Sequence, residues 1–487
     1  MFRRMHVRAW PALVVLAVLS GCGTAAELTV STAAALQPCV VPGLAEAADC
    51  ATVRVAESPG DPRGRSIDLR VVVLRAATDT PLGDPIVPLA GGPGQGAAEL
   101  TAIFTPRFNG FRDRRDLVFV DQRGTGGSNP LHCAAPKATA SLMGVLFDPE
   151  GLAACRDELA ARADLTKYTT SIAAADYEAV FDRLDYRQVN LIGTSYGSRL
   201  GLELTRRLPS RVRTLTIEAV VPTSFAWPSG AAPAMQAALD ALADDCAADA
   251  ACAQAFPGFR QDIEVAFARV RRNPVLVTVR DPDNAAVARV RFGTTDLAYA
   301  TRGLLYGNDA LSLPLWFRRA AEGDFSALAQ AYVNRARALD AQIARGVHLG
   351  VYCAEDAPFV DWRAAEAAAE GTRIGRYLIE QYRRACEIWP RGAIGASFRE
   401  PVVSNVPTLL MTGRRDPVTP PRTAIAAART LTRSRVVVFP RGGHGNDGLA
   451  SRSCRAGILQ RFIDSADPAA IDAGCASQDP SLPFRLR

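Results

Sequence analysis

The sequence predicts an α/β fold: a mostly parallel sheet covered on both faces by helices, with a helical segment inserted between two strands. Three observations lead to this prediction. Short apolar segments of strand length alternate with segments of helical spacing, which is typical of such sheets. A Gly-x-Ser-x-Gly sequence at 193–197 lies between a predicted strand and a predicted helix. A long alanine-rich stretch then interrupts the alternation.

The first part of the chain, residues 37–222, supplies most of the predicted strands. They are 67–74, 85–89, 116–120, 188–192 and 212–221. Apolar residues at helical spacing predict one helix over 171–184 and another over 198–208.

Residues 401–487 complete the sheet. Strands are predicted at 408–412 and 434–439, followed by a last helix at 453–463. Because strands of this part resume the earlier pattern, we expect both parts to belong to one sheet.

Residues 223–400 form the predicted insertion, in the position of a cap. Alanine-rich helical segments dominate it, at 231–251, 261–272, 320–344 and 362–384. A short strand-like segment at 275–280 interrupts them. The chain is therefore predicted to contain a sheet domain built from two separated parts, with a helical cap between them.

The amino terminus predicts export. Three arginines precede an apolar segment at 11–19, which is too short to span a bilayer. The segment ends in Leu-Ser-Gly-Cys, which resembles the lipobox of bacterial lipoproteins and makes Cys22 the predicted site of lipidation. Residues 1–21 are then a signal peptide and 22–36 a flexible tether. The alternative is an ordinary cleaved signal peptide with an incidental cysteine.

These features predict a protein of the cell envelope that contacts the membrane only through its amino-terminal lipid anchor. The composition, with 48% hydrophobic and 22% charged residues, is that of a globular protein. Removing the three leader arginines from the formal charge of +6 leaves +3. A charge this small over 487 residues does not predict nucleic-acid binding.

The cysteines predict disulfide bonds. Without Cys22, ten of the eleven cysteines remain, and an even number in an exported chain is typical of a disulfide framework. Their spacing suggests that sequence neighbours pair, as 39–50, 133–155, 246–252, 353–386 and 454–475. Other connectivities stay open at this point. The chain contains no Cys-x-x-Cys, and its four histidines are scattered along the sequence, so no metal site is predicted. No cofactor is expected either.

The glycine-flanked Ser195 is the candidate nucleophile. A Gly-x-Ser-x-Gly between a strand and a helix holds its serine on a sharp turn at the sheet edge, and a serine there needs a histidine base and an orienting carboxylate. Asp416 directly follows the strand at 408–412, and His444 directly follows the strand at 434–439. The order Ser, Asp, His is the one this architecture uses.

The oxyanion of the tetrahedral intermediate needs backbone donors. The N–H of the residue after the nucleophile is one donor, here Tyr196, and a loop after an earlier strand supplies the second. Gly92, in the Gly-Gly-Pro-Gly sequence that follows the strand at 85–89, is the predicted second donor. The Asp-Gln-Arg-Gly sequence at 121–124 is predicted to brace loops by hydrogen bonds rather than to react.

Five motifs occur in order along the chain: Gly-Gly-Pro-Gly at 91–94, Asp-Gln-Arg-Gly-x-Gly-x-Ser at 121–128, Gly-x-Ser-Tyr-Gly at 193–197, Gly-x-x-Asp-Pro-Val-Thr-Pro at 413–420 and Gly-Gly-His-Gly at 442–445. Together they resemble the proline iminopeptidase and tripeptidyl aminopeptidase family of α/β-hydrolase-fold serine exopeptidases. The cysteines and a Cys-x-x-Trp-Pro at 386–390 are similar to the secreted tripeptidyl aminopeptidases. Ala90 stands where iminopeptidases usually carry histidine, so strict proline specificity is not implied.

The resemblance implies a serine aminopeptidase that acts on peptides with a free amino terminus. In the iminopeptidases, acidic residues of the cap bind the peptide ammonium. Glu355 is the first candidate for this role and Asp356 the second, because a 353–386 disulfide would fix both residues. The alternative is that both are solvated surface acids or helix caps.

Two other functions stay open at this stage. An esterase or lactonase would use the same chemistry on small esters, since this fold hosts many acyl transfers. A non-catalytic binding protein on the same fold is the remote alternative, and the complete set of catalytic motifs argues against it.

Overall fold

The computed structural model of the chain describes residues 36–487 except 62, 109, 135–138, 144–145, 451–452, 479 and 481. The predicted signal peptide at 1–21, the lipidation site Cys22 and all but the last residue of the predicted tether lie outside the described residues.

A nine-stranded sheet organises the described chain, in the order β1-β2-β3-β5-β4-β6-β7-β10-β11. Its strands are β1 (Gln37–Cys39), β2 (Ala48–Ala56), β3 (Ser66–Leu74), β4 (Ile86–Leu89), β5 (Leu117–Val120), β6 (Val189–Thr194), β7 (Val212–Glu218), β10 (Thr408–Gly413) and β11 (Ser434–Phe439). The pairs from β5 through β11 are parallel, and the pairs from β1 to β5 are antiparallel. The predicted mostly parallel sheet is confirmed.

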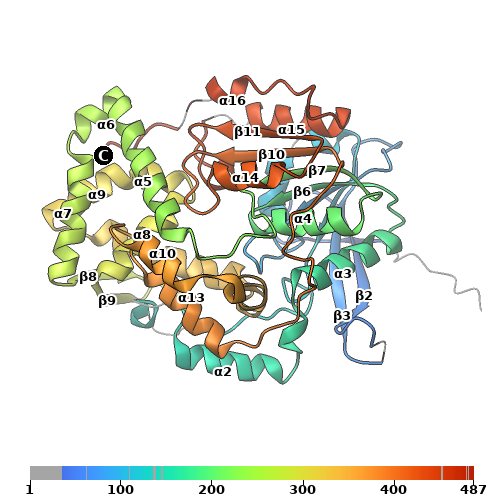
Figure 1. Cartoon of the computed structure of the whole chain (residues 1–487), viewed down its shortest axis with the longest axis horizontal. Helices are drawn as coiled ribbons and strands as arrows, with labels where there is room; N and C mark the ends of the chain where they lie inside the picture. Colours follow the sequence, from blue (N-terminus) through green and yellow to red (C-terminus); the bar gives the residue numbers. More distant parts are fainter. Residues whose placement is uncertain are drawn as a thin grey trace, which may run out of the picture. The chain divides into compact units, whose positions relative to one another are not determined.

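Alternate residues of the strands pack on opposite faces. In β3, Val71 and Val73 belong to one apolar cluster, whereas Val72 and Leu74 belong to another. The first cluster includes side chains of α3 (Thr170–Arg183) and α4 (Tyr196–Arg207), and the second includes side chains of α15 (Ser453–Ser465). Helices therefore cover both faces, as the alternation of strands and helices predicts (Figure 1).

The segment between β7 and β10 contains helices and a separate two-stranded sheet, and in Figure 1 its helices α5 to α10 gather to one side of the strands of the large sheet. Its longer elements are α5 (Ala231–Ala248), α6 (Ala250–Ala255), α7 (Phe259–Arg272), β8 (Val275–Arg280), β9 (Val287–Phe292), α8 (Thr294–Leu305), α9 (Leu313–Glu322), α10 (Ser326–Gln342), α11 (Arg345–Val351), α12 (Trp362–Ala369) and α13 (Tyr377–Ile388). The domain boundaries proposed at 222 and 400 stay a prediction.

The insertion packs in two different ways. Most buried side chains of α5 to α10, such as Leu239 and Phe267, belong to a further apolar cluster, which Leu142 and Phe484 from outside the insertion also join. Side chains from Ala344 to Trp389 join the cluster that covers the sheet. The second half of the insertion is thus fixed directly to the core that carries the nucleophile helix.

Several element boundaries differ from the predicted ones. The helix expected from residue 198 starts at Tyr196, directly after Ser195. The helix expected over 231–251 is divided into α5 and α6 at Asp249, whose side chain accepts a hydrogen bond from Cys252 N and so caps α6. Strands β1, β2 and β9 were missed, because partly exposed strands near a sheet edge carry a weak apolar pattern.

All five predicted disulfide bonds form. They join Cys39 to Cys50, Cys133 to Cys155, Cys246 to Cys252, Cys353 to Cys386 and Cys454 to Cys475. The pairing of sequence neighbours is therefore confirmed.

The Asp-Gln-Arg-Gly loop after β5 braces its surroundings. Arg123 binds the carboxylate of Asp176 on α3 with two hydrogen bonds of 2.6 Å, and Asp121 accepts bonds from the backbone of Glu99 and Gly127. The predicted bracing role is confirmed by these contacts.

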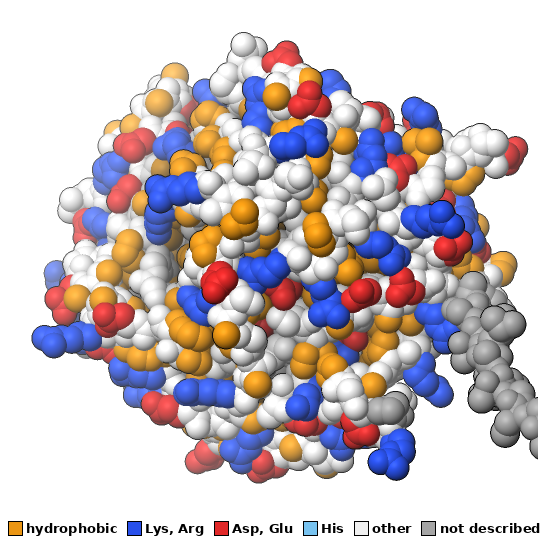
Figure 2. Space-filling model, turned by 45° about the vertical axis from the view of Figure 1, so that its right-hand side comes forward, with side chains coloured by type: hydrophobic (Ala, Val, Ile, Leu, Met, Phe, Trp, Pro, Cys, Tyr) orange, Lys and Arg blue, Asp and Glu red, His pale blue; other side chains and the backbone are white. Residues whose placement is uncertain are grey.

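Charge is mixed on the face of the molecule that Figure 2 shows, where basic and acidic side chains are interspersed. Among the described residues, no helix has the length and apolar character needed to cross a membrane.

Candidate active site

Ser195 lies on a sharp turn between β6 and α4. Its backbone has a φ of 59° and a ψ of −124°, a conformation that L-residues rarely adopt. The flanking glycines are required sterically: a Cβ at Gly193 would overlap the carbonyl of Gly197, and a Cβ at Gly197 would overlap the carbonyl of Leu89. The Gly-x-Ser-x-Gly spacing therefore allows the close approach that presents Ser195 at the sheet edge.

His444 and Asp416 meet at the same edge. Each residue follows the carboxyl end of a strand, β10 for Asp416 and β11 for His444. The Nδ1 atom of His444 lies 2.9 Å from Oδ2 and 3.0 Å from Oδ1 of Asp416. A carboxylate at this distance fixes the orientation and tautomer of an imidazole.

Asp416 is held as an ionised acceptor. Its carboxylate also accepts from the backbone of Val418 and Thr419 and, at 2.7 Å, from the hydroxyl of Thr419. Burial alone would raise the pKa of Asp416, but His444 and the bonds from Thr419 outweigh this effect and hold the pKa below its usual value.

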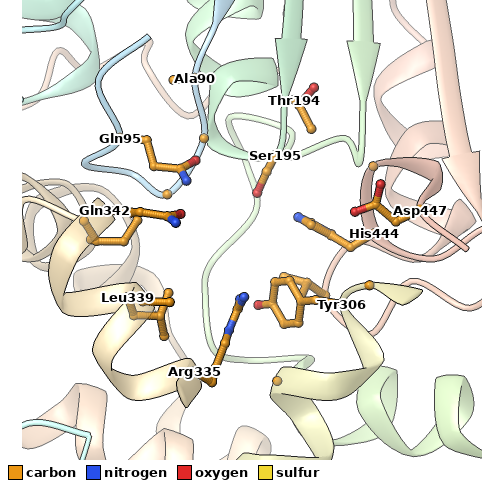
Figure 3. A pocket seen from close by; sticks show the side chains of 18 of the residues that line it. Ala90, Gln95, Thr194, Ser195, Tyr306, Arg335, Leu339, Gln342, His444 and Asp447 are labelled. Carbon is orange, nitrogen blue, oxygen red and sulfur yellow. The ribbon is translucent and has the colours of Figure 1, made fainter. Parts of the chain in front are cut away.

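Ser195 and His444 line one cavity of about 890 Å³. Figure 3 shows the Ser195 hydroxyl and the His444 ring pointing into the cavity, with a ring nitrogen directed toward Ser195. The insertion supplies the opposite wall, including Tyr306, Arg335 and Gln342. The geometry thus brings together a hydroxyl, an imidazole and a carboxylate in the order that nucleophilic catalysis requires.

The loop at Gly91–Gly94 lies against Ser195. A Cβ at Gly91 would be 3.3 Å from the Ser195 Cβ, and Gly92 has a φ of 107°, which favours glycine. Tyr196 is the first residue of α4, so its N–H is one of those without an acceptor inside the helix. Both predicted oxyanion donors therefore belong to segments that adjoin the Ser195 hydroxyl.

The insertion clamps this loop. The amide of Ala344 donates to the carbonyl of Gly94 at 2.9 Å. Nδ1 of His348 donates to the carbonyl of Pro93 at 3.1 Å, so Nε2, 2.9 Å from the Tyr382 hydroxyl, is the acceptor of the neutral ring. Burial lowers the pKa of His348 to about 3, which keeps the ring neutral. His348 holds the loop rather than serving as a base.

Glu355 and Asp356 are completely buried. Glu355 accepts from the amide of Thr170 at 2.6 Å and from its hydroxyl at 2.8 Å. Asp356 binds the guanidinium of Arg199 at 2.8 and 3.2 Å. They are therefore not the solvated surface acids of the alternative interpretation. Burial raises the pKa of Glu355 to about 7.

The two acids differ in their access to Ser195. Among the described residues that line the large cavity, neither acid is present. Asp356 lines a second cavity of about 20 Å³, which Ser195 and Arg199 also border. That volume is enough for about one water molecule. The amine-binding role of these acids stays a prediction, and the geometry favours Asp356 over Glu355.

Sequence reasoning missed two residues. Arg199 is 1% exposed and lies one helical turn after Ser195, and an arginine among the apolar residues of that helix is a signal that could have indicated a buried partner. Tyr306, whose ring centroid lies 4.9 Å from that of His444, belongs to no motif.

Two family descriptions match the chain. One, alpha/beta hydrolase fold, matches residues 84–255, which include β4, β6 and Ser195. The other, TAP-like protein, matches residues 371–475, which include Asp416 and His444. The chain has the α/β-hydrolase fold. These matches agree with the resemblance that the five motifs predict.

Known proteins resemble this chain at moderate identity. Serine protease Hip1 of Mycobacterium tuberculosis is 25% identical over 384 residues, which cover 70% of this chain and 71% of the relative. Proline iminopeptidase of Neisseria gonorrhoeae is 30% identical over 151 residues, 30% of this chain and 37% of the relative. The crystal structure of proline iminopeptidase from Mycobacterium smegmatis superposes with a TM-score of 0.42 at 17% identity, covering 86% of this chain and 99% of that one.

Proposed function

We propose that this α/β hydrolase is an exported serine exopeptidase that removes amino acids or short peptides from the free amino termini of peptides. The observation that carries the proposal is the Asp416–His444 pair at 2.9 Å, with the imidazole directed at the elbow serine in one cavity. The names of the relatives, a serine protease and a proline iminopeptidase, support a peptide substrate.

In the proposed mechanism, the Ser195 hydroxyl attacks the scissile carbonyl while His444 takes its proton. Asp416 stabilises the imidazolium that forms. The amides of Gly92 and Tyr196 donate to the oxyanion of the tetrahedral intermediate. His444 then protonates the leaving amine, and an acyl-enzyme remains on Ser195. Water, deprotonated by His444, hydrolyses this ester and releases the amino-terminal product.

The proposed recognition of the substrate ammonium uses Asp356, which borders the small cavity beside Ser195. An amine there would add a second cationic partner to a carboxylate that already binds Arg199. Glu355 is the weaker candidate because Thr170 occupies both of its oxygens.

A peptide library tests the proposal directly. The protein is incubated with peptides that carry a free or an acetylated amino terminus, and the products are identified by mass spectrometry. We expect amino-terminal fragments to be released from the peptides with a free amino terminus and not from the acetylated ones. The Ser195→Ala variant should be inactive, and a fluorophosphonate should not label it. Cleavage of small esters with no cleavage of any peptide would identify an esterase instead.

Export and anchoring form a separate part of the proposal. Five disulfide bonds support an oxidising compartment. Cys22→Ala is expected to abolish lipidation and to move the protein from the membrane fraction to the soluble one. Unchanged partitioning of this variant would contradict the anchor.

A further inference from the structure

Two arginines of the insertion contact one tyrosine ring in the cavity wall. The guanidinium carbon of Arg335 lies 5.0 Å from the centroid of Tyr306, and that of Arg302 lies 5.2 Å from it. Arg302 also donates to the Tyr306 hydroxyl at 2.6 Å. The Tyr306 ring in turn lies 4.9 Å from the ring of His444. Two positive charges therefore contact the tyrosine ring that lies against His444.

These two arginines lack the acidic partners that other arginines of the cavity have. Arg345 pairs with Asp340, and Arg107 lies 3.6 Å from Asp447. Within the part of the chain that the structure describes, no carboxylate pairs with Arg302 or Arg335. The Nε of Arg302 is buried and has no hydrogen-bond partner among the described residues. Since a buried donor needs an acceptor, the Arg302 Nε is unsatisfied, and neither guanidinium has a carboxylate partner among the described residues.

A glycine on a neighbouring helix makes room for the side chain of Arg335. A Cβ at Gly303 would lie 3.0 Å from the Cγ of Arg335, so the glycine leaves room for the arginine stem across α8. Figure 3 shows the guanidinium of Arg335 and the hydroxyl of Tyr306 pointing into the cavity, on the side opposite Gln95 and Ala90. The charge is thus directed at the space that a substrate bound at Ser195 would fill.

We propose that Arg335 and Arg302 bind a carboxylate of the substrate while its scissile carbonyl lies at Ser195. A guanidinium presents parallel N–H donors that match the two oxygens of a carboxylate. This inference rests on the proposed peptidase function, in which the carboxylate is either the free carboxyl terminus of a short peptide or an acidic side chain. The cavity would therefore select anionic peptides, in addition to the free amino terminus.

Matched peptides test this specificity. One pair differs only in a carboxyl-terminal acid or amide, and a second pair, with amidated ends, differs only in a glutamate or glutamine side chain. A charge-assisted bond supports a preference of roughly tenfold or more in kcat/KM for the acid. Arg335→Gln should bring that acid-to-amide ratio close to one. Arg289→Gln, at an exposed arginine of the same insertion, is the matched control and should retain the ratio.

Each outcome decides between the alternatives. A preference in the first pair assigns the carboxyl terminus, and one in the second pair assigns a side chain. Equal rates within both pairs for the wild-type protein, or a preference that Arg335→Gln retains, would overturn the carboxylate site.

A binding measurement separates this result from the fate of the peptidase proposal. Calorimetric titration of the Ser195→Ala protein with the same acid and amide peptides needs no turnover. Tighter binding of the acid, lost when Arg335→Gln is added, supports the site even if peptides are not cleaved. Equal binding of acid and amide would overturn it.

Discussion

Asp416 and Asp356 are the same chemical group in two different surroundings near Ser195. Each is 1% exposed. Asp416 binds His444, which opens onto the cavity, whereas Asp356 binds Arg199, an arginine that is also 1% exposed. Burial raises the pKa of Asp356 despite Arg199, while His444 and Thr419 hold the pKa of Asp416 low. The partner therefore sets the protonation chemistry: a histidine can exchange protons with a substrate, whereas the guanidinium of Arg199 stays protonated and holds Asp356 in place beside the small cavity.

The largest expected effect is on turnover. Asp416→Asn should lower kcat by roughly 10⁴-fold, because an amide stabilises the wrong tautomer of His444. Ser195→Ala should lower kcat at least as much, and combining the two changes should add little, since the three residues act as a unit. Steady-state kinetics with circular dichroism as a folding control checks this prediction. Near-normal turnover of Asp416→Asn would remove the residue from the catalytic group.

The second largest effect is on stability. Asp356→Asn removes the nearest charged partner of the buried Arg199 guanidinium, which keeps the carbonyl of Phe225 at 2.9 Å and the carboxylate of Glu355 at 3.4 Å. Breaking a buried ion pair in this way costs about 3–5 kcal/mol. Denaturant unfolding with the disulfides intact should show this loss for Asp356→Asn and a smaller one for Asp416→Asn. The two substitutions are chemically identical, so equal losses of stability would break the comparison.

A surface pair provides the matched control for this measurement. Asp68 binds Arg54 at 2.7 Å, with the two side chains 48% and 70% exposed. Asp68→Asn should change the free energy of unfolding by about 0–1 kcal/mol, because solvent screens exposed pairs.

The same contrast explains what the sequence could and could not predict. Ser195, Asp416 and His444 lie in the loops that begin at the carboxyl ends of β6, β10 and β11, so local order and parallel strands are enough to bring them together. The partners of Glu355 are 156 and 185 residues away, at Arg199 and Thr170. Whether that carboxylate faces a cavity or an arginine depends on tertiary packing, which no local pattern carries.

The strands likewise divide into those that the sequence predicts and those that it does not. The central strands, such as β6 and β10, are buried along their whole length or nearly so, and their apolar runs were predicted. β2 and β9 alternate between buried and exposed positions, and their pairing is set by neighbours rather than by composition. Arg335 and Tyr306, from two separate helical segments, meet over the cavity without any shared motif.

The third prediction concerns pH and Glu355. The pKa of this carboxyl rises from 4.5 to about 7 on folding, so between these values the folded protein holds a proton that the unfolded chain has released. The stabilisation that this bound proton gives to the folded protein is fully present below about pH 4.5. It is lost as the pH rises through 7, and the total loss is up to about 3 kcal/mol. Glu355→Gln, which cannot ionise, should flatten this decline in thermal stability between pH 5 and 7.5. An unchanged pH profile would show that Glu355 is ionised in the folded protein at all these pH values.

The smallest expected effect is at Thr419, whose hydroxyl donates to Asp416 at 2.7 Å. Thr419→Val removes this bond but keeps the shape of the side chain and the backbone N–H that also donates to Asp416. The carboxylate therefore loses one neutral donor. A hydrogen bond to a charged group is worth about 1.5–3 kcal/mol in stability. Because Asp416 is ionised both before and during the proton transfer, a smaller part of it, about 0.5–1.5 kcal/mol, is expected in kcat, a fall of roughly two- to tenfold with KM unchanged. Thr423→Val is the control, because its hydroxyl bonds to the carbonyl of Pro420 at 3.0 Å and not to Asp416. If both valine variants lost the same activity, the effect would belong to packing in the loop, and Thr419 would have no special part in holding Asp416 ionised.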